Sequence, residues 1–480
     1  MIIIGCDIGK DLTVAVSVPM ETYQSSDPAE FFLNADFKEC TPDIVGLQKL
    51  LDLDGDVYIM EPTGRYSRVW ANNLAHHGKE VRFVAHDKLA AYRGNCGWTD
   101  KDDYHDAIAL AWYGWERLNR PNAFNRMRLP VLQKMIATFL KHRRLADEYT
   151  VLANQSRNLL SEECPEIQNK RSFSSKPGYP PPLWAYLAND ERITKNARTR
   201  YNKILETTIG TAHRDFNDGF SEELVRRSKR ICEVQLTRES LEIQLKEYLD
   251  RKEFEWYQNV FDRYAFGTFQ RVLILHQIFP FEQLLNDNLG EIKILMKRRS
   301  RSKSGKFPKR RVSWGRFHSA LGKAPSQRSS GKRQGVTVEG SALCRSYLYL
   351  WGNVHIFRRE ARYRKNIYPF IDIIHRYESS IQEAGELELA IATAINQNKD
   401  LIDQLKPLLN NVAGGKAILD HLEKIPDRFK QKLTVEKVKR DSKKVLGNWA
   451  KSRASDLLVK MLFKDLVKAC RVHHGKPQGY

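Results

Sequence analysis

Apolar and polar residues follow two different rhythms over the first 120 residues of the chain. Short apolar runs, typical of buried strands, are separated by segments in which apolar residues recur every three or four positions, as in amphipathic helices. The predicted strands are 1–6, 12–18, 57–60 and 80–85, and the predicted helices are 67–77 and 106–118. The first two strands read as a hairpin. This order predicts an α/β domain with a mixed sheet, which we place at residues 1–125.

From residue 129 onward the pattern becomes helical, with heptad-like spacing. One seam consists of Leu145, Tyr149, Leu152, Ser156 and Leu159, and a second consists of Ile231, Val234, Leu241, Leu245 and Tyr248, with Arg238 as a polar interruption. The proline-rich stretch 174–182 between the seams cannot be helical and predicts a loop. Two coiled-coil-like helices around such a loop predict an antiparallel hairpin or a dimerisation arm at 126–255.

The rest of the chain is expected to form a mainly helical domain at 256–355 and a basic helical extension at 356–480. We find no chemistry in the extension. The domain at 256–355 contains the most basic run of the protein, between residues 297 and 306. Phosphate contact is the favoured role for such a run in a nucleic-acid enzyme. Its first basic residues are Lys297, Arg298, Arg299 and Arg301.

Charge is distributed unevenly over the 480 residues. The formal net charge is +21, but residues 1–60 carry −8 and the remaining 420 residues carry +29. An acidic segment beside a strongly basic remainder suits a protein that binds cations and phosphates together. The seven cysteines are scattered and never form a C-x-x-C pair, which argues against a zinc ribbon or a disulfide framework and favours a reducing cytoplasm. No stretch approaches the roughly 20 apolar residues of a membrane span, and the apolar N-terminus reads as a strand rather than a signal peptide.

Four carboxylates stand where a nuclease core of the RNase H type needs them. Asp7 and Glu61 each end an apolar run, and Asp103 and Asp106 open a segment of helical composition. Residues three apart on a helix share a face, so the last two carboxylates point the same way. Four hard oxygen ligands suit a pair of Mg²⁺ ions, which can clamp the attacking and leaving oxygens of a phosphodiester. This pattern predicts an enzyme that acts on nucleic acid.

A second motif occupies residues 322–333 and 340–348. Ser330 precedes a glycine, which lets a phosphate approach the backbone closely. Arg328, Lys332 and Arg333 surround this serine with positive charge, and Arg345 follows a few residues later. The serine is either a nucleophile whose hydroxyl is activated by its surroundings or part of an ordinary basic loop.

Together these motifs resemble the DEDD-type insertion-sequence transposases, a family that includes the Piv-type invertases and the RNA-guided bridge recombinases. Residues 5–11 match the family's G-x-D-x-G-K-D, residues 61–66 its E-x-T-G-x-Y, and residues 103–107 its D-x-x-D-A. The family's second domain has a G-L-A-P segment, a Ser-Gly, a Gly and a Leu-Arg. These fall on 322–325, 330–331, 340 and 344–345.

The resemblance implies an RNase H-like (RuvC-like) N-terminal domain, coiled-coil-like helices and a mainly helical transposase domain. Asp7, Glu61, Asp103 and Asp106 would be catalytic and hold Mg²⁺, two ions per site. Ser330 would attack the scissile phosphate and form a covalent phosphoserine, so that resealing needs no ATP. The implied reaction is site-specific DNA cleavage, strand exchange and rejoining.

The resemblance also implies partners. These are double-stranded donor and target DNA, a structured guide (bridge) RNA that pairs with them, and further copies of the chain in a homodimer or homotetramer. The metal site of one protomer would then work with the serine of another. The expected location is the cytoplasm, in association with the nucleoid.

Some positions depart from the family pattern, and two other functions stay open. Lys323 replaces an apolar residue, Cys344 replaces a leucine, and Asp102 beside Asp103 allows the alignment to slip by one. His105 is either a helper that takes the serine proton or a surface histidine of the helix. The alternative enzyme is a hydrolytic RuvC-like endonuclease or junction resolvase in which Ser330 is structural. A third reading is a nucleic-acid-binding protein without catalysis.

Overall fold

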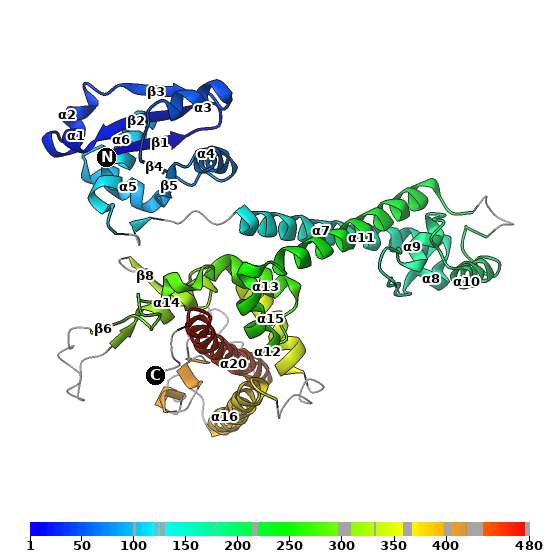
Figure 1. The fold of residues 1–480 in the computed structure, drawn as a ribbon. Helices are drawn as coiled ribbons and strands as arrows, with labels where there is room; N and C mark the ends of the chain where they lie inside the picture. The colour runs from blue at the N-terminus through cyan, green and yellow to red at the C-terminus, as the bar shows by residue number, and fades with distance from the viewer. Residues whose placement is uncertain are drawn as a thin grey trace. The chain divides into compact units, whose positions relative to one another are not determined.

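The computed structural model describes most of the chain as two compact units, residues 1–129 and 130–480, each of which is described here by itself (Figure 1). The described residues are 1–98, 102–120, 123–124, 130–174, 176–213, 219–295, 309–330, 333–358, 367–397, 406–407, 409–411, 414–416, 418–419 and 435–475.

The N-terminal unit is built on a five-stranded mixed sheet of order β3-β2-β1-β4-β5. Its strands are β1 (Ile2–Ile8), β2 (Thr13–Pro19), β3 (Phe37–Cys40), β4 (Val57–Met60) and β5 (Glu80–Phe83). Strand β2 pairs antiparallel with both β1 and β3, whereas β4 pairs parallel with β1 and β5. The predicted hairpin, the strand at 57–60 and the mixed character of the sheet are therefore confirmed. The short edge strand β3 was not predicted.

Helices cover both faces of this sheet. The helices of the unit are α1 (Met20–Ser25), α2 (Pro28–Phe32), α3 (Ile44–Leu51), α4 (Arg65–His76), α5 (His86–Asn95) and α6 (Asp103–Arg117). Because side chains alternate along a strand, Ile3 and Ile59 pack with α6 on one face, whereas Ile4 and Met60 pack with α3 and α4 on the other. The unit is thus a three-layered α/β structure, and α6 lies directly against its central strand.

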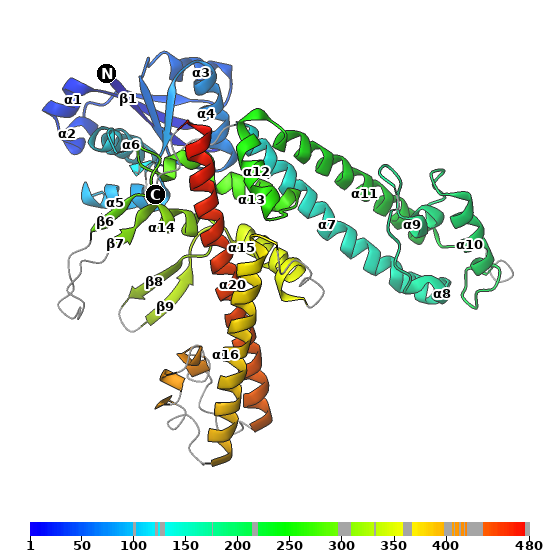
Figure 2. The ribbon, with the colours of Figure 1, turned by 60° about the horizontal axis from the view of Figure 1, so that its bottom comes forward.

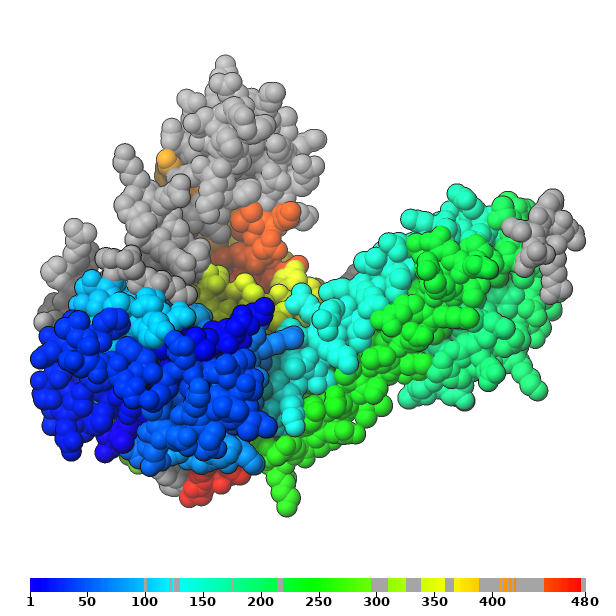
Figure 3. All heavy atoms as spheres, turned by 90° about the horizontal axis from the view of Figure 1, so that it is seen from above, coloured from blue at the N-terminus to red at the C-terminus, as the bar shows by residue number. Residues whose placement is uncertain are grey.

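The second unit begins with a long antiparallel helical hairpin. Helices α7 (Pro130–Glu163) and α11 (Glu222–Leu249) lie side by side, as the ribbon of Figure 2 and the space-filling view of Figure 3 show. The start of α7 packs with the end of α11, and the end of α7 packs with the start of α11. The two helices share three hydrophobic clusters, which contain Phe139 with Leu245 and Leu249, Leu145 with Val234 and Leu241, and Leu160 with Leu224 and Ile231. The predicted seams therefore meet within one chain, as the hairpin reading expected.

The segment that connects the two long helices carries a small helical cluster. Its helices are α8 (Pro165–Gln168), α9 (Pro182–Leu187) and α10 (Lys195–Leu205). The described residues of the proline-rich stretch are non-helical up to Pro181, and Pro182 occupies the first turn of α9, where a missing N–H costs nothing. Trp184 is buried in the core of this cluster.

The body of the second unit is mostly helical. After η2 (Lys252–Phe254) it contains α12 (Glu255–Arg263), α13 (Thr268–Ile278), η3 (Phe281–Leu284), β6 (Lys293–Leu295), β7 (Lys309–Arg311), α14 (Val312–Ala320), β8 (Pro325–Ser330), β9 (Arg333–Val338), α15 (Ala342–Gly352), η4 (Asn353–Phe357), α16 (Phe370–Gln397) and α20 (Val435–His473). Helices α16 and α20 run alongside each other (Figure 2). The structure describes no helix that is long and apolar enough to cross a membrane.

One hydrophobic core joins segments that the sequence divides into three regions. It contains Phe139 from the first, Phe281 and Phe317 from the second, and Ile374 and Phe463 from the third. The expected extension at 356–480 therefore supplies part of the core on which the motif-bearing region 256–355 packs.

Candidate active site

Asp7 and Glu61 lie on neighbouring parallel strands at the same edge of the sheet. The register pairs Cys6 with Met60, so Asp7 and Glu61 each follow the last paired position of β1 and β4. Side chains alternate between the two faces of a strand, and Ile3 and Ile59 point towards α6. Asp7 is four residues after Ile3 and Glu61 is two residues after Ile59, so both carboxylates point towards the same helix. Both side chains are buried, at 8% and 9% exposure.

The first turn of α6 supplies the other two carboxylates. Asp102 is the N-cap, and its carboxylate accepts hydrogen bonds from the backbone N–H of His105 and from the His105 ring. Asp103 and Asp106 follow as the first and fourth residues of the helix. Asp102 is thus engaged in capping, and Asp103 is the residue that shares a hydrogen bond with Asp7. This arrangement favours the alignment on Asp103.

Gly5 sets how closely α6 approaches the sheet. A Cβ atom at Gly5 would lie 1.9 Å from the carbonyl oxygen of Ala107 and 2.8 Å from the backbone nitrogen of Ala111. Only a glycine permits this backbone-to-backbone contact. Because Gly5 and Asp7 lie on the same face of β1, the contact brings the first turn of α6 level with the Asp7 carboxylate.

Electrostatic repulsion marks this cluster. Burial raises the pKa of Asp7 most, followed by the negative charge of Asp103, a hydrogen bond with Asp103, and the negative charges of Asp106 and Glu61. Together these effects bring the pKa of Asp7 to about 7. The charged form of Asp7 is therefore costly in the absence of a compensating cation. The other three predicted acids thus all act on Asp7, and of the four only Asp103 is solvent-exposed.

Two basic residues that the sequence analysis did not identify contact these acids from α5. His86 pairs with Glu61 through its Nδ1, and Nη1 of Arg93 lies 2.5 and 2.8 Å from the two carboxylate oxygens of Asp106. Asp106 is only 1% exposed. His86 and Arg93 are seven residues apart and so share one face of the helix. This spacing could have identified His86 and Arg93 in the sequence, but only if it had been known that α5 packs against α6.

The acids are not arranged at metal-ligand spacing as they stand. Across the described ranges, the group of three metal-type side chains with ligand atoms within 4.8 Å of one another is Glu282, Cys470 and His474, in the second unit. There, burial raises the pKa of the Cys470 thiol to about 12, and a protonated thiol is a poor ligand. Among the predicted acids, Asp106 is instead held by Arg93 and Glu61 by His86.

His105 lies outside the acid cluster. Its ring donates a 2.8 Å hydrogen bond to Asp102 and stacks on Phe32 at a centroid distance of 4.2 Å. Trp98 contacts it from another side, at 4.7 Å. These contacts favour the reading of His105 as a structural residue of the helix start.

The predicted serine motif lies in the second unit. Strands β8 and β9 form an antiparallel hairpin in which Ser330, the last residue of β8, pairs with Arg333. Arg328 pairs with Gly335 in the same hairpin. Residues 331–332, with Lys332, lie outside the described residues, as do Lys297, Arg298, Arg299 and Arg301 of the basic run.

The glycines of this motif form the base of the hairpin. Gly322 and Gly340 have φ values of +72° and +92°, and a Cβ on either would collide with the backbone of Ser341 or Ser319. Nη1 of Arg345 donates a 2.9 Å hydrogen bond to the Gly322 carbonyl. This contact gives Arg345 a role in holding the loop, and its predicted contact with nucleic acid stays a prediction.

Lys323 and Cys344, the two residues of this region that differ from the motif pattern, each pack against other parts of the second unit. Cys344 is buried in the core, where it replaces one apolar side chain with another. Lys323 is largely buried, and its Nζ lies 3.1 Å from Oδ1 of Asp456 on α20. The charge at position 323 is therefore compensated from the C-terminal region.

The chain was compared with protein-family models and with curated proteins. No model of a protein family matches the chain, and a search of curated proteins finds no significant match.

Proposed function

We propose that this protein is a Mg²⁺-dependent DNA recombinase of the DEDD transposase type, which cuts and rejoins DNA through a phosphoserine at Ser330. The observation that carries the proposal is the placement of Asp7, Glu61, Asp103 and Asp106. Two adjacent parallel strands and the first turn of one helix direct all four motif carboxylates to the same edge of one sheet. The five-stranded mixed sheet is compatible with the RNase H-like fold that the resemblance implies.

The four carboxylates offer the type of ligand atom that Mg²⁺ prefers. These ligand atoms are hard carboxylate oxygens, and the mutual repulsion centred on Asp7 is what a divalent cation relieves. Asp7, Glu61, Asp103 and Asp106 would hold the metal, which supplies charge for the scissile phosphate and the leaving oxygen. In this structure Arg93 forms an ion pair with Asp106, and His86 contacts Glu61.

The serine has a separate role in the proposed reaction. The Ser330 hydroxyl loses its proton and attacks phosphorus, and the DNA strand leaves through its own oxygen, which is protonated. The bond to phosphorus is exchanged rather than hydrolysed, so the reverse attack by a DNA hydroxyl reseals the strand and frees the serine. Guidance by a structured RNA and assembly as a dimer or tetramer belong to the same proposal.

The test is a covalent-adduct assay. The protein is co-expressed with its native flanking DNA, so that any guide RNA is present, then mixed with Mg²⁺ and junction DNA and denatured. We expect a DNA-linked band in the wild type that is lost in Ser330→Ala and in Asp7→Asn. Ser329→Ala is the matched control, because it removes the neighbouring hydroxyl of the same strand.

The alternative enzyme gives a different result. Cleavage without an adduct that persists in Ser330→Ala would identify a hydrolytic, metal-dependent nuclease. An adduct lost equally in Ser329→Ala and Ser330→Ala would indicate damage to the hairpin and not removal of a nucleophile.

A further inference from the structure

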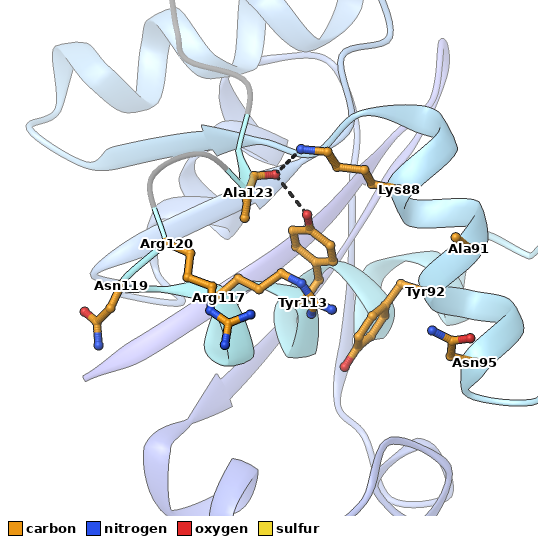
Figure 4. A pocket seen from close by; sticks show the side chains of 9 residues that line it. All are labelled: Lys88, Ala91, Tyr92, Asn95, Tyr113, Arg117, Asn119, Arg120 and Ala123. Carbon is orange, nitrogen blue, oxygen red and sulfur yellow. Dashed lines mark hydrogen bonds between the residues drawn. The ribbon is translucent and has the colours of Figure 1, made fainter. Parts of the chain in front are cut away.

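A pocket of about 720 Å³ lies on the N-terminal unit between α5 and the C-terminal half of α6 (Figure 4). Two tyrosines from these helices, Tyr92 and Tyr113, meet edge to face in it at a centroid distance of 5.6 Å. The guanidinium of Arg117 lies over both rings, 4.4 Å from the Tyr113 centroid and 5.1 Å from that of Tyr92. This stack holds a positive charge in a fixed position at the surface.

Besides the two tyrosines and two alanines, the described residues that line the pocket are cations and amides, and none of them is a carboxylate. Lys88, Arg117 and Arg120 carry the charge, and Asn95 and Asn119 add amide groups. Lys88 donates to the carbonyl of Ala123 at the rim, as the dashed line in Figure 4 shows. Such a lining attracts an anion with hydrogen-bond acceptors, and phosphate is the anion that combines both properties.

Part of the lining has no partner within the described structure. Asn95, Asn119 and Arg120 are exposed, and their side chains make no hydrogen bond or ion pair with any described residue. Arg117, by contrast, is held by the two rings and by Glu116, 2.5 Å away outside the lining. The pocket therefore combines one pre-positioned cation with several groups that are available to a ligand, which lowers the entropy cost of binding.

Helix α5 separates this pocket from the acids. Successive residues turn by about 100° around a helix, so His86 and Arg93 face the acids, whereas Lys88 and Asn95 face the opposite side. A helix with its side chains is about 10–12 Å across. The major groove of B-DNA is about 12 Å wide. Helix α5 can therefore lie in this groove, with one DNA strand on the side of the acids and the other strand on the side of the pocket.

We propose that the pocket binds the phosphate backbone of the second strand of a DNA duplex whose first strand is cut at the acids. This inference rests on the proposed function and adds to it a substrate-binding site on the side of α5 that faces away from the metal ligands. The bound groups are phosphates, with Arg120 and Arg117 as the principal contacts and Asn119 as a hydrogen-bonding partner.

Binding of the full-length protein to a 30-base-pair DNA duplex in metal-free buffer tests the proposal. Arg120→Gln should weaken binding about 3- to 10-fold at moderate salt and reduce the slope of log K against log salt by about 0.9, as expected for the loss of one phosphate contact. Asn119→Ala should weaken binding without changing the slope. Lys49→Gln, which removes an exposed charge from α3 on the opposite face of the sheet, is the control.

A photo-crosslinking amino acid at Asn119 gives a local readout. It should crosslink to duplex DNA, and the same group at Lys49 should not. Unchanged affinity and slope in Arg120→Gln, no crosslink from Asn119, or effects confined to a duplex RNA of the same length would each overturn the pocket's assignment.

These outcomes separate the two proposals. If the wild type forms the serine adduct while Arg120→Gln binds DNA normally, the pocket assignment fails and the proposed function stands. If the wild type binds no DNA, the proposed function fails, and the pocket assignment fails with it.

Discussion

Arg93 and Asp106 form a buried ion pair in which one guanidinium nitrogen contacts both carboxylate oxygens, at 2.5 and 2.8 Å. Asp106 is 1% exposed, and the Arg93 side chain is 15% exposed. A carboxylate so deeply buried requires a cation, and in this structure Arg93 supplies it. Under the proposed function, a metal ion at Asp106 must displace this guanidinium, so Arg93 and the metal compete for one carboxylate.

Arg93→Met should therefore destabilise the metal-free protein by about 3–5 kcal/mol, the usual cost of leaving a buried charge unpaired. Chemical unfolding in EDTA measures this loss, and added Mg²⁺ or Mn²⁺ should restore more stability to the variant than it adds to the wild type. Arg251→Met is the control, because the Arg251 side chain is half-exposed where it pairs with Glu253. An equal metal-induced gain in the wild type and Arg93→Met would refute the competition.

Gly5→Ala should disrupt the contact between β1 and α6. The new methyl group would overlap the backbone of Ala107, which cannot move without shifting the helix. We expect a loss of about 1–3 kcal/mol, typical of overpacking, together with weaker metal binding because the first turn of α6 is displaced. Thermal unfolding and metal titration measure the two effects.

Gly94→Ala provides the comparison. Gly94 lies in α5, and a Cβ there would meet no atom within 4 Å. This variant should be unchanged or more stable by about 0.5–1 kcal/mol, because alanine favours the helix. Equal losses in the two variants would show that close packing at Gly5 is not the cause.

The raised pKa of Asp7 predicts a pH-dependent stability in the absence of metal. The pKa is about 7 in the folded protein against 3.8 for a free side chain. Between these values the unfolded chain has lost the proton that the folded chain still holds, so this group makes stability fall as the pH rises from about 4 to 7. Metal binding should strengthen over the pH range around 7, because it requires the deprotonated carboxylate.

Asp7→Asn should consequently raise the melting temperature in EDTA at pH 8 and have a smaller effect at pH 5. The free energy of unfolding at pH 8 should increase by on the order of 1–3 kcal/mol, because one charge is removed from a repulsive cluster. A variant that is less stable than the wild type at pH 8 would contradict the repulsion inferred for this site.

Lys323 and Asp456 should be energetically coupled although they are 133 residues apart in sequence. Lys323→Met places an apolar residue at this position but leaves Asp456 without its 3.1 Å partner. In a double-mutant cycle with Asp456→Leu, we expect a coupling of about 0.5–1.5 kcal/mol, because Asp456 is half-exposed and solvent screens the pair. Additive effects of the two substitutions would show that the contact contributes nothing.

Local patterns were sufficient for the elements that carry the proposed chemistry. The apolar run before Asp7, the run before Glu61 and the helix at Asp106 were all predicted, because strand and helix periodicities mark which side chains are buried. Heptad spacing predicted the two long helices in the same way, as an antiparallel hairpin or a dimerisation arm, and the structure shows the hairpin of α7 and α11. Strand β3 and helix α5 were among the elements that the sequence analysis missed. Strand β3 has only four residues, of which Glu39 is exposed, and α5 buries only Leu89 and Tyr92.

The sequence by itself determined the two strands and the helix that carry the four acids, and the positions of the acids along them, since these depend on neighbouring residues. Only the tertiary structure decided their partners: Arg93 for Asp106, His86 for Glu61, and Asp456 for Lys323. It also brought α20 into the core around Phe317. Periodicity specifies that a face is buried but not which distant segment covers it. That choice depends on how the side chains of all the segments pack together.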